Sequence, residues 1–218
     1  MVGMIIQTDD RFDRFFDNKK GFIIGGGTSL SKISQSIWDR LKNEITIGTN
    51  ASYELIESNF LVIGDLFFWK AFKNEINKLK SIVFSPYDVL INKNCFVEKQ
   101  IFALKREKKD YKKLSNSLAD TISWWNNVGV TALRIAYILG INPIYLLGFD
   151  LQDNHNRHNF HDKYEKKRPY KVEPPYNNFY ESFEVVIKQL EEKNVKVISC
   201  NEYSKLNKII EYKQLELC

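Results

Sequence analysis

The feature that most constrains the fold of this chain is the junction within Gly21–Leu30, where an apolar run meets three consecutive glycines. The run Phe22–Ile24 has the composition of a short strand that is buried on both faces. Glycine permits positive φ and a close approach of a ligand to the main chain. The N-terminus of a following helix offers unpaired N–H groups to an anion. We therefore predict a phosphate- or nucleotide-facing loop made of Gly25, Gly26, Gly27, Thr28 and Ser29.

This loop does not match the two common phosphate-binding motifs. It lacks the Gly-Lys-Ser/Thr ending of a P-loop, and its spacing differs from the Gly-x-Gly-x-x-Gly of a dinucleotide-binding turn. Both differences argue against an ordinary kinase or dehydrogenase. A tight turn between strand and helix, without a ligand, is the alternative to a binding loop.

Short apolar runs alternate with amphipathic segments along the whole chain. Such runs are typical of parallel strands that are covered on both faces, and the segments between them have helical spacing. The alternation predicts an α/β fold, namely a single Rossmann-like domain over 1–218 with a mostly parallel sheet and helices on both faces. The predicted strands are 21–25, 45–48, 60–64, 82–85, 144–147 and 195–199, and the predicted helices are 30–41, 66–79, 129–140, 178–193 and 204–211.

Two segments interrupt this alternation. The segment 88–120 is rich in lysine and has no clean period, so we interpret it as an insertion or a lid; a solvated helical face is the alternative. The segment 151–178 is polar and contains all three histidines of the chain. We predict that it forms a loop of the active site.

Polar residues and glycines stand where several predicted strands end. Ligands of parallel α/β sheets bind at the carboxyl ends of the strands, so these residues are expected to share one site with the glycine loop. Asn50 and Asp65 can hydrogen-bond a ribose, a base edge or a sugar hydroxyl, and a helix N-cap is the alternative for both. Asp150 is a candidate catalytic residue, which could orient a catalytic group, bind a hydroxyl or hold the following loop, and an orienting or structural role is favoured. Gly148 and Gly129 are predicted to line the nucleotide, Gly129 at a second helix N-terminus.

The three histidines, His155, His158 and His161, are spaced three residues apart. We predict no metal site there, because no cysteine and no clear carboxylate completes a set of ligands. A single histidine that acts as a general base is favoured, since the side chain titrates near neutral pH. His161 is our first choice because it lies between Phe160 and Asp162, and His158 is the second. A polar loop without a chemical role is the alternative.

The composition sets broad limits. The net charge is +5, from 32 Lys and Arg against 27 Asp and Glu, which suits an anionic substrate or a membrane surface. The cysteines are Cys95, Cys200 and Cys218, whose wide spacing indicates neither a disulfide framework nor a zinc site. No signal peptide and no membrane-spanning run is recognised. We therefore expect a cytoplasmic protein, with peripheral contact to a membrane as the alternative.

Several of these pieces together resemble one group of enzymes. The shared pieces are Gly25–Leu30 (Gly-Gly-Gly-Thr-Ser-Leu), Asn50, Asp65, Gly129–Gly140 and Ile144–Asp150, which occur in the same order. The chain resembles the bacterial CMP-sialic-acid-dependent sialyltransferases with a Rossmann-like fold. It also resembles their relatives, the motility-accessory-factor glycosyltransferases and the 6-hydroxymethylpterin diphosphokinase-like proteins.

The resemblance implies an inverting, metal-independent transfer of a sugar from a CMP donor. It implies that the glycine loop, Asn50 and Gly129 line the nucleotide, and that a histidine in the loop after the Gly-x-Asp strand is the base, which His161 matches best. The chain departs from the family in one place. The family carries tyrosines for the donor phosphate soon after the aspartate, where this chain has Leu151 and Gln152.

We therefore expect a glycosyltransferase-like enzyme that takes a sugar from a nucleotide-activated donor, with a CMP-sugar favoured, to an acceptor hydroxyl. The acceptor is a glycan or, given the basic segment 105–113, a modified base of a nucleic acid. No cofactor is required beyond the donor, and a homo-oligomer is compatible with the sequence. One alternative is a pterin-type pyrophosphokinase that uses ATP and Mg²⁺, with Asp65 and Asp150 as metal ligands. A second alternative is a non-catalytic nucleotide-binding module.

Overall fold

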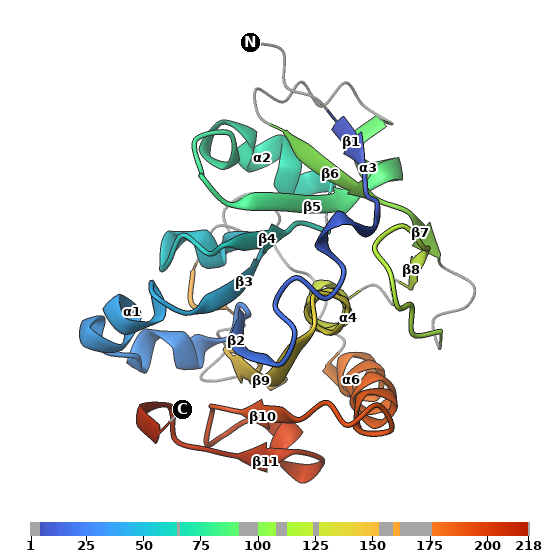
Figure 1. Ribbon diagram of the computed structural model, residues 1–218. Coiled ribbons are helices and arrows are strands. Elements are labelled where there is room, and N and C mark those ends of the chain that lie inside the picture. Colours follow the sequence, from blue (N-terminus) through green and yellow to red (C-terminus); the bar gives the residue numbers. More distant parts are fainter. Residues whose placement is uncertain are drawn as a thin grey trace.

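A nine-stranded sheet forms the centre of the molecule, and each of its strands runs parallel to its neighbours (Figure 1). The structure is a computed structural model. It describes residues 5–64, 66–91, 100–107, 113–123, 127–152, 159–161 and 176–217. In spatial order the strands are β1 (Ile5–Gln7), β6 (Ile101–Leu104), β5 (Ile82–Pro86), β4 (Phe60–Val62), β3 (Ile45–Thr49), β2 (Lys19–Ile24), β9 (Ile141–Leu147), β10 (Val197–Ser199) and β11 (Glu211–Tyr212).

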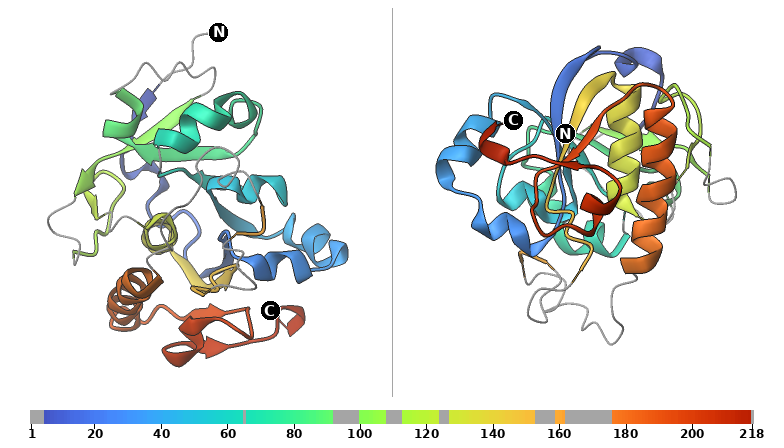
Figure 2. Two further views of the ribbon diagram at one scale, coloured as in Figure 1. Left: turned by 180° about the vertical axis from the view of Figure 1, so that it is seen from behind. Right: turned by 90° about the horizontal axis from the view of Figure 1, so that it is seen from below.

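Helices cover both faces of this sheet. Figure 2 shows α4 and α6 side by side against one face, with the segments that contain α1 and α2 against the other. A small parallel pair, β7 (Arg106–Glu107) and β8 (Ile122–Ser123), stands apart from the main sheet. The α-helices of the described residues are α1 (Gln35–Leu41), α2 (Leu66–Ile76), α3 (Tyr87–Ile91), α4 (Val128–Ile138) and α6 (Tyr176–Glu191).

The core is divided by the sheet, because successive side chains of a strand point to opposite faces. On β2, Ile23 packs towards α4, while Phe22 and Ile24 pack towards α1. The helix α4 has nine buried residues over its eleven positions, so it lies within the core rather than on the surface. The parallel α/β architecture that the alternating pattern predicted is thereby confirmed.

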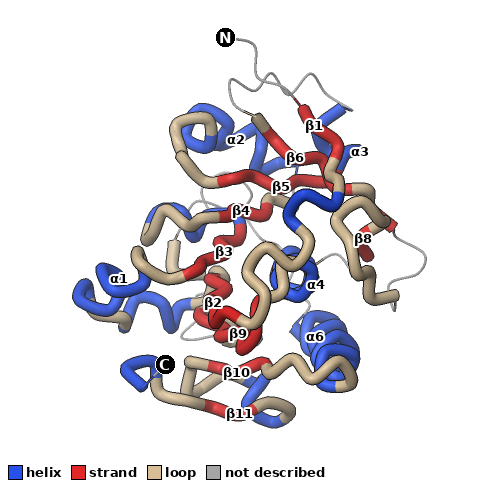
Figure 3. Tube along the Cα trace, in the orientation of Figure 1, coloured by secondary structure: helices blue, strands red, loops and turns tan. Residues whose placement is uncertain are grey.

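Three local predictions differ from the structure, as the tube in Figure 3 shows. The helix expected over 30–41 is divided into a 3-10 turn, η2 (Thr28–Lys32), and α1, because Ile33 and the α1 N-cap Ser34 are extended. Leu30 and Trp38 nevertheless pack in one cluster, so the apolar spacing is kept.

The segment 88–120 contains β6, a fully buried strand of the main sheet, which the sequence analysis did not predict. Its four apolar residues are too few to show a period. The short edge strands β1 and β11 were missed for the same reason. Near the C-terminus, the expected helix 204–211 is a 3-10 turn, η4 (Lys205–Lys208), followed by β11. The interpretation of 88–120 as a lid stays a prediction.

The order of the strands fixes where a ligand can bind. After β2 the chain builds β3, β4, β5 and β6 on one side, and it later returns to place β9, β10 and β11 on the other side. The loops that leave β2 and β9 therefore diverge and open a crevice at the carboxyl edge of the sheet. Such a switch in strand order is the usual ligand-binding position of an open α/β sheet.

Candidate functional site

A pocket of about 500 Å³ lies at this switch point. It extends along the carboxyl edge of the sheet from the end of β9, past β2, β3 and β4, to the segments that follow β5 and β6. The residues predicted from sequence that line it are Gly25, Gly26, Gly27, Asn50, Gly129, Gly148, Asp150 and His161. The predicted site residues Asp65 and His158 lie outside the described residues.

The glycine loop is tied to the turn after β9. The N–H of Gly25 donates to the carbonyl of Leu147, and the N–H of Gly27 donates to that of Gly148, both at 2.8 Å. A Cβ on Gly25 would lie 2.5 Å from the Gly148 oxygen, so the two turns touch through their main chains. A contact within the protein thus requires glycine at position 25, and the predicted contact of this loop with a ligand stays a prediction.

Asp150 is the side chain that holds the glycine loop in place. It is 8% exposed, and its two carboxylate oxygens accept four hydrogen bonds. The donors are Thr28 Oγ1 at 3.2 Å, Ser29 N at 2.9 Å, Ser29 Oγ at 2.5 Å and Asn201 Nδ2 at 2.7 Å. These four donors give both oxygens of the buried carboxyl group hydrogen-bond partners. Asp150 therefore has the position of an orienting residue, and Thr28 and Ser29 face it instead of the main pocket.

Asn201 belongs to this network and was missed by the sequence analysis. It is buried, and its side-chain oxygen also accepts the N–H of Tyr203 at 3.0 Å. It follows β10 by two residues, so the signal that found Asn50, a polar residue just after a strand, was present for Asn201 as well.

Asn50 presents an acceptor to the pocket. It is the first residue after β3 and has φ +47°, a left-handed conformation that asparagine tolerates better than most residues do. Its Oδ1 is buried and has no hydrogen-bond partner within the part of the chain that the structure describes. A buried polar atom without a partner costs about 1–3 kcal/mol, which a ligand donor would recover.

The N-terminus of α4 also lines the pocket, through Asn127, Val128 and Gly129. Its N-cap Asn127 accepts the N–H groups of Gly129 at 3.0 Å and Val130 at 3.4 Å, and donates to Ser182 Oγ at 3.2 Å. The N–H groups of Gly129 and Val130, in the first turn of α4, thus already have an acceptor within the protein. Gly129 leaves room for the ring of Phe149, since a Cβ at position 129 would lie 2.4 Å from that ring.

An aromatic wall completes the β9 end of the pocket. Its members, Phe149, Tyr176, Phe179 and Phe183, line the pocket from the turn after β9 and from one face of α6. The rings of Phe149 and Phe183 meet edge to face, with centroids 5.4 Å apart. Sequence reasoning missed this wall, although the spacing 176, 179 and 183 is that of one helix face.

His161 enters the same pocket beside the glycine loop. The N–H of the preceding residue, Phe160, donates to the carbonyl of Gly26 at 3.0 Å, which ties this part of the loop after β9 to the end of β2. The imidazole is 8% exposed and packs edge to face on the Phe160 ring, with centroids 4.8 Å apart. The predicted base and the predicted phosphate-facing loop are therefore neighbours, although Gly26 and His161 are 135 positions apart in the chain.

The cation among the described lining residues is Arg106, the first residue of β7. Its side chain is 13% exposed and forms an ion pair with Asp88, in the first turn of α3. The sequence analysis did not single out either residue, because both fall in the lysine-rich segment.

The described residues contain no group of three or more His, Cys, Asp or Glu side chains placed to hold a metal ion. They also contain no helix that combines the length and the apolar character needed to cross a membrane.

No protein-family model matches the chain, and no protein with a curated description matches it by sequence. The fold does match solved structures. The sialyltransferase CstII from Campylobacter jejuni, in complex with the substrate analogue CMP-3FNeuAc, has a TM-score of 0.58 at 18% identity, covering 90% of this chain and 87% of that one. Another CstII structure contains a trisaccharide acceptor and CMP; its TM-score is 0.53 at 18% identity, with coverages of 89% and 86%.

Two further enzymes share the fold. The monofunctional alpha-2,3-sialyltransferase Cst-I from Campylobacter jejuni has a TM-score of 0.59 at 17% identity, with coverages of 90% and 81%. The MAf glycosyltransferase from Magnetospirillum magneticum AMB-1 has a TM-score of 0.65 at 12% identity. The match covers all of this chain and 36% of the MAf chain. The predicted resemblance to these two groups is thus confirmed at the level of the fold.

Proposed function

We propose that the protein is a glycosyltransferase that moves a sugar from a nucleotide-activated donor, of the CMP-sugar type, to an acceptor hydroxyl of a glycan. One observation carries this proposal: His161 lies in the same pocket as the glycine loop, joined to it through the hydrogen bond from Phe160 N to Gly26 O. A group that can take a proton thus stands beside a loop that can face a phosphate. Sugar transfer from a nucleotide donor needs both.

The donor would lie along the pocket with its base against the aromatic wall. Tyr176 and Phe179 are half-buried there and offer ring faces to a pyrimidine. The phosphate would then reach the glycine loop, where Gly25 and Gly27 already donate within the protein and the N–H of Gly26 is the amide we assign to it. We assign the buried Oδ1 of Asn50 to a hydroxyl of the donor.

In the reaction, His161 would take the proton of the acceptor hydroxyl as that oxygen attacks the anomeric carbon. The bond from the anomeric carbon to the phosphate oxygen breaks, and the electron pair remains on the phosphate of the released nucleotide. The N–H of Gly26 would stabilise this charge, as a preorganised donor does where charge develops. Asp150 would act indirectly, by holding Thr28 and Ser29 and with them the loop. The preference for CMP rests on the fold shared with CstII, whose structures contain CMP or a CMP-sugar analogue.

A thermal-shift panel tests the donor half of this proposal. The protein is heated with CMP, CDP, UDP, GDP or ATP, each with and without Mg²⁺. We expect CMP to raise the melting temperature without Mg²⁺ more than the other nucleotides do. Stabilisation by ATP only with Mg²⁺ would instead support the pyrophosphokinase alternative. No stabilisation by any nucleotide would refute a nucleotide-dependent function.

A further inference from the structure

The order of the strands arranges the walls of the pocket in a line. The aromatic wall lies at the β9 end, the glycine loop at β2, Asn50 at β3 and Arg106 just beyond β6. Four inter-strand spacings of about 4.8 Å, or about 19 Å along the sheet edge, separate the ends of β2 and β6, and Arg106 follows the end of β6 by two residues. Arg106 therefore stands at the end of the pocket opposite to the aromatic wall.

The described lining of the pocket contains one acidic residue, Asp150, and one arginine, Arg106, and the surroundings of these two side chains differ. Asp150 is surrounded by four donors from the protein itself. Arg106 forms an ion pair with Asp88, which does not line the pocket and whose side chain is 40% exposed. The ion pair keeps the guanidinium at the pocket wall, and a guanidinium is always charged. The β6 end of the pocket is thus its cationic end.

We infer that Arg106 binds an anionic group, a carboxylate or a phosphate, on the acceptor substrate, so that the enzyme selects acidic glycans as acceptors. The inference rests on the proposed function, because it needs the donor to occupy the pocket from the β9 end as far as Asn50. The reacting centre then lies beside His161, and the acceptor extends from there past Asn50 towards Arg106. Arginine is suited to this task, since its planar fork matches a carboxylate or a phosphate with two parallel hydrogen bonds.

The structural alternative is that the pair of Arg106 and Asp88 only joins β7 to α3. The two roles differ in what they predict for substrate choice. If the pair is purely structural, its loss lowers stability and changes the affinities for acidic and neutral acceptors equally. If Arg106 recognises the acceptor, its loss changes the ratio of these two affinities.

The test compares three probes of similar size: glucuronate, glucose 6-phosphate and the neutral methyl glucoside. Their dissociation constants are measured by NMR titration, both with saturating CMP and without it. For the wild type we expect at least one of the two acids to bind about tenfold more tightly than the neutral sugar, and which acid does so tells carboxylate from phosphate. In Arg106→Gln this ratio should fall to about one, while the affinity for CMP is unchanged.

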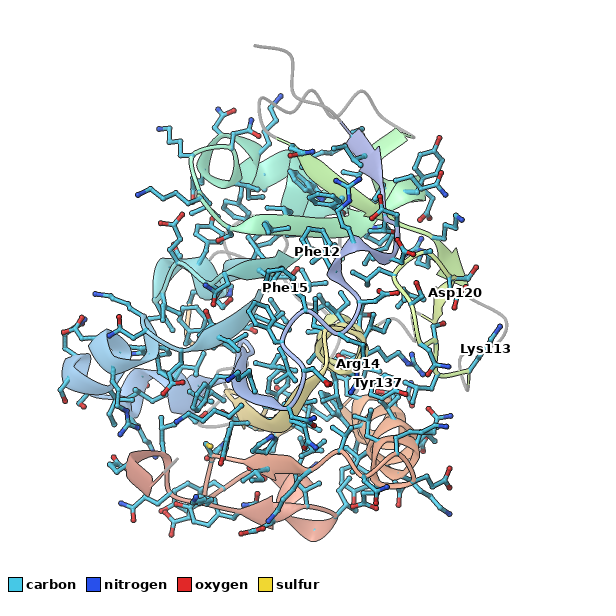
Figure 4. All side chains as sticks on the ribbon, viewed as in Figure 1. Phe12, Arg14, Phe15, Lys113, Asp120 and Tyr137 are labelled. Atoms are coloured by element: carbon cyan, nitrogen blue, oxygen red, sulfur yellow. The ribbon has the colours of Figure 1, made fainter. Side chains whose placement is uncertain are left out.

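Two further variants make the test selective. Arg14→Gln is the matched control, because Arg14 also pairs with an aspartate, Asp17, but lies at the C-terminal end of α4, near Tyr137 (Figure 4). It should keep the preference for acids. The double variant Arg106→Gln/Asp88→Asn removes both charges of the pair, so no carboxylate is left without its cation; it should fold and should also lose the preference.

The inference is overturned if the wild type binds acidic and neutral probes alike, or if either Arg106 variant keeps the preference. Its failure is distinct from a failure of the proposed function. If the wild type does not bind CMP, the proposed donor is wrong. The acid preference measured without CMP still reports on Arg106 in that case.

Discussion

Ser29 donates two hydrogen bonds to Asp150, one from its main-chain N–H at 2.9 Å and one from its hydroxyl at 2.5 Å, across 121 residues of sequence. The two residues follow β2 and β9, the neighbouring parallel strands at which the order of strands in the sheet reverses. The contact closes the base of the pocket, because it fixes the glycine loop relative to the turn after β9. Asp150, a candidate catalytic residue from the sequence, therefore has a positioning role in our mechanism.

Asp150→Asn tests this contact. The amide cannot accept all four hydrogen bonds, and its NH₂ group would face a donor, so we expect the free energy of unfolding to fall by about 1–3 kcal/mol. The affinity for CMP should fall as well, because the loop is no longer held. Urea denaturation and a CMP titration measure the two effects. Asp39→Asn is the control: Asp39 is an exposed aspartate that pairs with Lys42, and its replacement should leave the free energy of unfolding nearly unchanged. Equal losses in both variants would contradict the positioning role.

The glycine loop offers a comparison of two neighbouring positions. A Cβ at Gly27 would lie 2.5 Å from the carboxyl group of Asp150, whereas a Cβ at Gly26 would lie 3.1 Å from the side-chain oxygen of Asn159. We expect Gly27→Ala to destabilise the fold, since packed atoms must move. Gly26→Ala should keep most of the stability and lose affinity for CMP, because the methyl group enters the pocket. Melting curves with and without CMP distinguish the two; identical behaviour of both variants would argue against our assignment of Gly26.

Asn50→Gly removes the buried acceptor while keeping the left-handed backbone, which glycine adopts without strain. We expect little loss of stability, because the deleted Oδ1 has no partner among the described residues. Ligand affinity should fall about tenfold or more, as for the loss of a hydrogen bond worth about 1.4 kcal/mol or more. Calorimetric titration with CMP and with CMP-N-acetylneuraminate locates the contact. Loss of CMP affinity places it on the ribose, and loss for the full donor alone places it on the sugar. Unchanged affinity for both would show that Asn50 does not bind the donor.

His161→Gln tests the general base. Removing a positioned base typically costs about 10²–10⁴ in rate. We expect a loss of this size in the release of CMP from the donor in the presence of an acceptor, while the affinity for CMP stays within about twofold. The measurement is a coupled assay of CMP release under single-turnover conditions. Unchanged turnover would exclude His161 as the base, and His158 would then be the next residue to replace.

Much of the fold is readable from local patterns. Runs such as Phe22–Ile24 are apolar at every position because both faces of a parallel sheet are covered, and this signal is as visible in the sequence as in the structure. The ends of β2, β3 and β9 were also found, because glycine, asparagine and aspartate interrupt apolar runs. The strand β6 was missed because its four residues are too few to show a period and the segment around them is rich in lysine.

The sequence by itself determined the α/β class and which residues end the strands, because burial on both faces and the chemistry of turns act over a few neighbouring residues. Tertiary structure alone decided which of these ends meet. It decided that Asp150 accepts hydrogen bonds from Ser29, that Phe160 brings His161 to Gly26, and that Arg106 lines the same pocket. The reason is physical: the order of strands in a sheet is set by packing between distant segments, and no local pattern records it.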